Sequence, residues 1–158
     1  MDMIDKQILT LLQDNARIKK SEMARELNLP ATTLQERIRR LEKNGIIKKY
    51  QVIVDPEMIG FLVQAFVAVT LDRHESSDIR DFEKSVKTIP NIKACYHSSG
   101  RFDYLLHLVA RDLNELGVLV KTRITSLPDF GRCETHLVFS EIETSNQWPF
   151  LDDKAMEV

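Results

Sequence analysis

The 158-residue sequence is poor in several residue types that are abundant in specialised classes of protein. Its two cysteines, Cys95 and Cys133, are too few for a disulfide framework, and in a reducing compartment we expect both to be free thiols. Five glycines and five prolines exclude a collagen-like or low-complexity chain. The sequence has no run of about 18 apolar residues, so it predicts no membrane-spanning helix.

The remaining composition is that of an ordinary globular protein, with 43% hydrophobic and 29% charged residues. This length suits one medium domain or two small ones. The first residues, MDMIDKQ, are acidic where a signal peptide would be basic and then apolar. We therefore expect a cytosolic protein.

The net charge of −2 conceals a division along the chain. Residues 1–50 carry 11 Lys and Arg against 7 Asp and Glu, whereas residues 51–158 carry 11 against 17. Because phosphate affinity depends on local positive charge, the first module is where nucleic acid would bind. An imbalance of this size also occurs in domains that bind no nucleic acid, so charge alone does not decide.

Three short helices are predicted within the first 45 residues, because apolar side chains recur there at helical spacing. Asp2 and Ser21 are the predicted N-caps of the first two helices, and Gly45 supplies the stop of the third. The second and third helices are separated by only a few residues around Pro30, which indicates a helix-turn-helix. The predicted ranges are 3–15, 21–28 and about 31–44.

The third helix keeps its polar residues outside the apolar stripe of Leu34, Ile38 and Leu41. Thr and Gln side chains can bond base edges, and Arg can bond guanine or phosphate. A solvated polar face on an ordinary helix would look the same, but the tight turn and the basic bias favour DNA binding. The predicted DNA-contacting residues are Lys20, Ser21, Thr32, Thr33, Gln35, Glu36, Arg37, Arg39 and Arg40.

The rest of the chain predicts strands and helices in the order β-α-β-β-α-β, the ferredoxin-like plan in which four antiparallel strands carry two helices on one face. The β-branched residues of 46–54 predict a further strand that Asp55-Pro56 ends. The fold class is therefore α+β, with a helix-turn-helix (winged-helix-like) domain followed by a ferredoxin-like domain. The predicted strands are 62–71, 91–98, 103–110 and 131–142, and the helices are 77–88, with Phe82 inward, and 112–125, with Leu113 inward. The predicted parts are a DNA-binding domain (1–50), a linker (51–61), a ligand-binding and oligomerisation domain (62–143) and a C-terminal tail (144–158).

The first strand of this second domain is apolar on both sides, since Phe66 and Ala68 alternate with Val67 and Val69. The two helices cover only one side of the sheet. A second subunit is the simplest cover for the other side, so we expect a homodimer with sheets packed face to face.

Three segments resemble the Lrp/AsnC family, the leucine-responsive and asparagine-responsive transcription regulators of bacteria and archaea. They are IDKQILTLLQDNARI, ELNLPATTLQERIRRLEKNGIIKKY and SSGRFDYLL, and the resemblance extends from Ile4 to Glu143. It implies a sequence-specific, double-stranded DNA-binding regulator whose second domain binds an effector, commonly an amino acid. It also implies dimers that often assemble into octamers.

The resemblance places the effector site in the hairpin loop and the last strand. Turn amides there can receive a carboxylate and Asp103 an α-ammonium group, although Gly100 could simply make the turn and Asp103 cap it. Two positions depart from the family pattern: Pro30 stands where the recognition helix usually begins with Ser, and Arg101 where the hairpin often has an acid. The residues so implied are Ser98, Ser99, Gly100, Arg101, Asp103, His136 and Val138.

Two other functions fit parts of the pattern. Sirohaem decarboxylases share the two-domain plan, but the four histidines here, His74, His97, His107 and His136, follow no motif that would hold a tetrapyrrole. An effector-independent, architectural DNA-binding protein is the second alternative. The sequence shows no nucleophile triad, phosphate loop or metal-ligand spacing, so we expect no enzyme activity, no cofactor and no metal.

Overall fold

A computed structural model describes residues 1–73, 75–142, 145 and 147–150 of the chain. The chain divides into two compact units. One holds Met1–Ile53 together with the described C-terminal residues, and the other holds Val54–Ile142.

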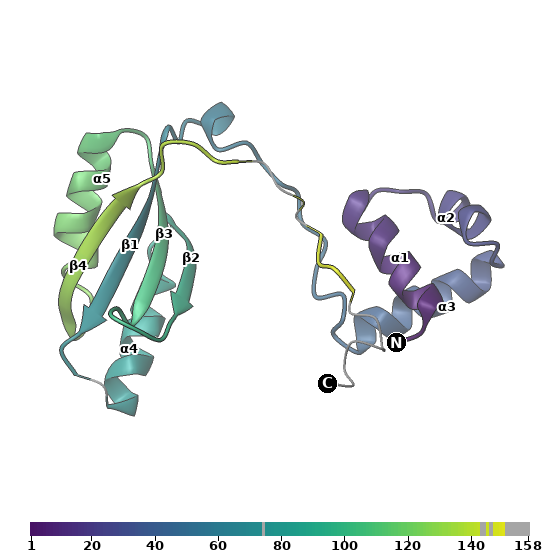
Figure 1. The fold of residues 1–158 in the computed structure, drawn as a ribbon, viewed down its shortest axis with the longest axis horizontal. Helices are drawn as coiled ribbons and strands as arrows, with labels where there is room; N and C mark the ends of the chain where they lie inside the picture. Colours follow the sequence, from purple (N-terminus) through teal and green to yellow (C-terminus); the bar gives the residue numbers. More distant parts are fainter. Residues whose placement is uncertain (74, 143–144, 146, 151–158) are drawn as a thin grey trace. The chain divides into compact units, whose positions relative to one another are not determined.

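The first unit is built of three helices, α1 (Met3–Asp14), α2 (Lys20–Glu26) and α3 (Ala31–Lys43) (Figure 1). The apolar stripe predicted for the third helix is confirmed, because each of its residues is at most 4% exposed. Burial of one such side chain contributes about 1.5–3 kcal/mol. The helices meet in a single core made of Ile8, Leu9, Met23, Ala24, Leu34, Ile38 and Leu41.

The helix ends show which capping predictions hold. Asp2 caps α1 as predicted, accepting from the Asp5 N–H at 2.8 Å, and the Asp5 carboxylate accepts in return from the Asp2 N–H. The predicted cap Ser21 is wrong, because it lies inside α2, whose N-cap Lys19 makes no side-chain capping bond. Asn28 and Gly45, with φ of 52° and 70°, end α2 and α3 in the left-handed conformation.

The strand predicted over residues 46–54 does not form. Ile46 and Ile47 instead donate their N–H groups to the Leu41 carbonyl at 3.0 and 3.2 Å, which completes the end of α3. Further on, Val52 and Ile53 are 78% and 80% exposed. β-Branched residues favour strands only where a neighbouring strand and a packing surface exist, and nothing in the described chain supplies them here.

The second unit contains one antiparallel sheet with the strand order β2-β3-β1-β4. This is the predicted ferredoxin-like order, with β2 and β4 at the edges. Cys95 and Cys133 lie on these two edge strands and are free thiols. The last strand ends earlier than predicted, at Leu137; the Val138 N–H still bonds the Gln64 carbonyl, one residue from the start of β1. The strands are β1 (Val63–Leu71), β2 (Ile92–His97), β3 (Tyr104–Ala110) and β4 (Phe130–Leu137).

Two helices, α4 (Ser76–Val86) and α5 (Leu113–Leu119), lie on the same side of this sheet (Figure 1). A π-helical turn, η2 (Val120–Ile124), continues α5. Phe82 is fully buried against the sheet as predicted, but Leu113 is 61% exposed, so its predicted inward position is wrong. Leu113 directly follows the N-cap Asp112, and the buried turn of the helix begins only later.

The opposite side of the sheet, called the open face here, carries alternate residues of each strand. Apolar, aromatic, amide and charged side chains all lie on this face. The Phe66 ring stacks on the His107 ring with centroids 4.9 Å apart, and His107 Nε2 lies 2.8 Å from Gln64 Oε1. The remaining residues of the open face include Ala68, Tyr96, Leu105, Val109, Arg132, Glu134 and His136.

Candidate DNA interface and effector site

The outer surface of α3 presents most of the predicted DNA contacts side by side. Thr32, Gln35, Glu36 and Arg39 line one shallow depression of about 300 Å³, and a second of about 490 Å³ continues along the helix to Lys43. Arg39 lines both depressions and is exposed. Within the described chain it makes no hydrogen bond or ion pair, so its guanidinium group is available to a phosphate or a guanine.

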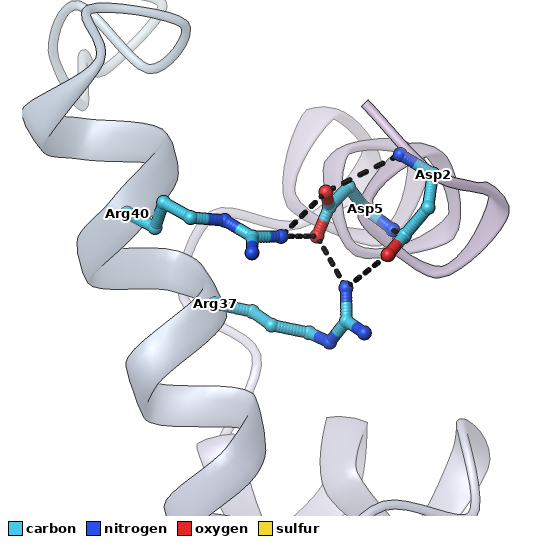
Figure 2. A network of polar contacts seen from close by, with 4 residues as sticks. All are labelled: Asp2, Asp5, Arg37 and Arg40. Carbon is cyan, nitrogen blue, oxygen red and sulfur yellow. Dashed lines mark hydrogen bonds and ion pairs between the residues drawn. The ribbon is translucent and has the colours of Figure 1, made fainter.

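Two other predicted arginines on α3 are bound to α1, as Figure 2 shows. Arg37 Nη1 donates to Asp2 Oδ2 at 2.6 Å and to Asp5 Oδ1 at 2.9 Å. Arg40 Nη2 donates to both Asp5 oxygens, at 3.2 and 2.9 Å. The Asp5 side chain is 4% exposed, so these charge-assisted bonds hold α3 against α1.

The network separates the predicted DNA-contacting arginines into two kinds: Arg37 and Arg40 are bound to acids of the first unit, whereas Arg39 is exposed. The hydrogen bond from Arg37, followed by that from the Asp5 backbone, lowers the pKa of Asp2, so the carboxylate stays ionised beside the arginine. Arg37 is 22% exposed and bound to two carboxylates, whereas Arg40 is 54% exposed. Sequence reasoning missed this network because its two halves lie 35 residues apart.

The beginnings of α2 and α3 supply the remaining predicted contacts. Lys20 and Ser21 are both exposed in the first turn of α2. Pro30 is the N-cap of α3 and makes no side-chain capping bond. Among the described residues, the first N–H groups of α3 therefore have no side-chain acceptor, and a helix N-terminus in this state favours an anion such as a DNA phosphate.

The hairpin loop between β2 and β3 is held by its own hydrogen bonds. The Ser98 N–H and hydroxyl donate to the carbonyls of Asp103 and Phe102 at 2.8 and 3.0 Å, and Gly100 has a φ of 121°. The Asp103 carboxylate accepts from the Leu71 N–H at 2.8 Å. Gly100 and Asp103 thus have a structural role in the turn, which is one of the two roles that the sequence left open for them.

Arg101 in the hairpin extends toward β4. Its Nη2 bonds Glu134 Oε1 at 2.6 Å, and its guanidinium carbon lies 5.1 Å from the centre of the Phe102 ring. The Arg132 guanidinium carbon lies 5.9 Å from the same ring. Phe102, which lies in the hairpin itself, was absent from the predicted site. Arg132 and Glu134 were absent too, because only strand pairing brings them to the hairpin.

The predicted effector residues do not form one cluster within a chain. The hairpin adjoins the end of β1 at Val69, whereas His136 pairs with Phe66 and the Val138 N–H bonds Gln64. At about 3.3 Å per residue, Phe66 and Gln64 lie roughly 10 Å or more from Val69 along β1. The hairpin and the pair His136 and Val138 are therefore separated along β1, although Arg101 reaches Glu134 on β4.

The histidines are dispersed over the second unit. His97 stacks on Tyr104 with ring centroids 4.8 Å apart, while His107 lies on the open face; His74 is outside the described residues. Within the described ranges, no group of three His, Cys, Asp or Glu side chains could hold a metal ion. None of the helices described is long and apolar enough to cross a membrane.

A basic recognition helix on a three-helix unit, followed by a β-α-β-β-α-β unit, defines a two-domain helix-turn-helix regulator. Residues 1–48 match the family description "Winged helix-turn-helix DNA-binding", and residues 64–148 match "Lrp/AsnC ligand binding domain". The chain belongs to the Lrp/AsnC family of DNA-binding transcriptional regulators.

Individual relatives are similar to this protein in sequence or in fold over nearly the whole chain. The leucine-responsive regulatory protein of Haemophilus influenzae is 32% identical over 92% of this chain and 88% of its own length. A transcriptional regulator of Neisseria meningitidis, solved in complex with L-methionine, superposes with a TM-score of 0.88 at 28% identity, covering 94% of this chain and 96% of that one. LrpC of Bacillus subtilis superposes with a TM-score of 0.80 at 33% identity, covering 91% and 98%.

Proposed function

We propose that this regulator contacts its DNA site with the exposed side of α3 and with the start of α2, and that an amino acid or a related metabolite regulates it from the second domain. The observation that supports the DNA contact is the position of Arg39, which is exposed, unpaired among the described residues, and in line with Thr32 and Gln35. Side chains near the start of α3 would bond base edges, and Arg39 would bond the backbone or a guanine. The first 50 residues would then form the DNA-binding domain, 51–61 the linker, 62–143 the regulatory domain and 144–158 the tail.

Arg39→Ala tests the DNA contact on genomic fragments recovered with the purified protein. We expect weaker binding and, if Arg39 contacts a phosphate, a salt dependence whose logarithmic slope is shallower by about one. Lys84→Ala, on an exposed position of α4, is the control and should bind like the unaltered protein. Binding by Arg39→Ala that equals the unaltered protein at every salt concentration would contradict the proposal.

The effector proposal is supported by the hairpin, whose turn amides and Arg101 can receive a carboxylate. The L-methionine bound to the Neisseria protein makes an amino acid the first class to test. Because the hairpin and the pair His136 and Val138 lie apart in one chain, a second copy would complete the site. A homodimer that covers the open face, and a higher oligomer such as an octamer, would provide that second copy.

Thermal unfolding with each of the twenty amino acids at millimolar concentration tests this part. Ligand linkage predicts that at least one raises the melting temperature, since a ligand at 100 times its Kd stabilises by about 2.7 kcal/mol. Arg101→Ala should reduce that shift, and Lys84→Ala should preserve it. If none of the twenty raises the melting temperature, the effector-independent architectural function replaces this proposal.

The protein would act as a regulator and not as an enzyme, in the cytoplasm where its DNA target lies. Its relatives are transcriptional regulators. A sirohaem decarboxylase would need a tetrapyrrole site, and His97 and His107 lie on opposite sides of the sheet. Incubation with sirohaem under reducing conditions should leave its carboxylates intact, whereas their loss would contradict this conclusion.

A further inference from the structure

The described C-terminal residues 147–150, called the strap here, lie against α1. The side-chain amide of Gln13 bonds the backbone of Trp148 twice: Oε1 accepts from the N–H at 2.6 Å, and Nε2 donates to the carbonyl at 3.3 Å. The indole of Trp148 is 81% exposed, so the backbone rather than the ring is held. This paired bonding is what a neighbouring β-strand would offer an extended segment.

A second contact of a different kind lies two residues farther along. The Phe150 side chain packs against the core that α1, α2 and α3 share. Two residues of extended chain span about 6–7 Å, so the amide contact and the apolar contact fix both the position and the direction of the strap. Neither contact belongs to the DNA-binding surface of α3.

The chain passes between the two compact units twice, first after Ile53 and again after Ile142. The first passage is the ordinary linker between the two domains. The second leads from β4 to the strap, which is attached to the first unit only by noncovalent contacts.

We propose that the strap is a releasable second tether, through which the chain that leaves β4 restrains the DNA-binding unit by binding Gln13 and the helical core. β4 also carries Glu134 and His136, so a ligand at the proposed effector site would act on the strand from which this tether begins. That consequence rests on the proposed function, whereas the docking itself does not.

Time-resolved fluorescence anisotropy tests the docking in the full-length protein, because Trp148 is the only tryptophan of the chain. In the unaltered protein we expect the Trp148 anisotropy to decay mainly with the slow tumbling of the folded molecule. Gln13→Ala should transfer most of that amplitude to nanosecond local motion. Gln7→Ala, an exposed position on the same helix, is the matched control and should leave the decay unchanged. Equal decays in the unaltered protein and Gln13→Ala would overturn the proposal.

Nitrogen-15 relaxation of the amides in α1, α2 and α3 tests the tether itself. Gln13→Ala combined with Phe150→Ser should shorten the apparent correlation time of these amides relative to those of the sheet. Chemical shifts within the helices show whether the unit remains folded, and Gln13→Ala alone replaces the double variant if it does not. Unchanged relative correlation times in the variant with a released strap would overturn the tether. DNA binding and amino-acid stabilisation are measured separately, so failure here is distinct from failure of the proposed function.

Discussion

Asp5 has 3% of its surface exposed and is the buried charged residue of the described chain. It completes the capping box of α1 and also binds two arginines of α3. A buried carboxylate is tolerated only when its oxygens are bonded, and here the partners are cations. The same side chain therefore stabilises a helix end and the contact between two helices.

Asp5→Ala should lower the free energy of unfolding of the DNA-binding unit by about 2 kcal/mol, because a cap is lost and two guanidinium groups lose their shared partner. Denaturation in guanidinium chloride, followed by helix circular dichroism, measures the change. Asp14→Ala removes an exposed acid from the same helix and should leave stability unchanged or slightly higher. If both variants unfold alike, the network contributes nothing measurable.

His107 gives the second domain a pH-dependent stability. Burial is the main cause that lowers the pKa of His107 from its usual 6.5; Lys93 lowers it further and Glu141 opposes the shift. The unfolded chain therefore binds this proton at higher pH than the folded chain, so the stabilising effect is complete above about pH 6.5 and is lost as the pH falls through the lowered pKa. The melting temperature should fall with acidification, and less steeply in His107→Gln. Parallel curves for the two proteins would assign the acid sensitivity to other groups.

At the scale of the element, the helix ends at Asp2 and Gly45 were predicted correctly, because the signal for each is local. Gly45 has a φ of 70° with open space around it, so the left-handed backbone alone requires glycine there. Gly117 lies within α5, and nothing lies within 4 Å of the place where a Cβ would be added.

Substitution of these two glycines by alanine should change stability in opposite directions. Gly45→Ala should destabilise the first unit by about 1 kcal/mol, because an L-residue is strained at that φ. Gly117→Ala should stabilise the second unit by up to about 1 kcal/mol, because alanine is the better helix former. Chemical denaturation monitored by circular dichroism measures both. Destabilisation by Gly117→Ala would indicate a close contact that the structure does not contain.

Predictions at this scale failed where an element depends on a distant partner. Residues 46–54 have the composition of a strand, yet strand formation needs a second strand, and α3 instead uses their first N–H groups. The sequence also did not show that Arg37, a predicted DNA contact, is bound to Asp2 and Asp5. The outer face of α3 was identified correctly, because helical periodicity separates its buried and exposed residues without help from the rest of the fold.

At the scale of the whole molecule, the open face predicts assembly. Phe66 lies at its centre on β1, beside His107 and close to Ala68 and Val109. Phe66→Asp should therefore dissociate the proposed homodimer, since an unpaired carboxylate would be buried in the interface. Sedimentation equilibrium measures the mass, with Arg80→Glu on an exposed position of α4 as the control. A Phe66→Asp protein that sediments like the unaltered one would place the interface elsewhere.

The sequence by itself determined the two units, the βαββαβ order, the recognition helix and the family, since each depends on local periodicity, turn residues or contiguous motifs. Only the tertiary structure decided which contacts particular side chains make. It bound Arg37 and Arg40 to α1, left Arg39 available, separated the hairpin from His136 and Val138, and placed the strap on Gln13. The physical reason is that these contacts join residues far apart in the chain. Their energies depend on distance and burial, which no local pattern in a single sequence encodes.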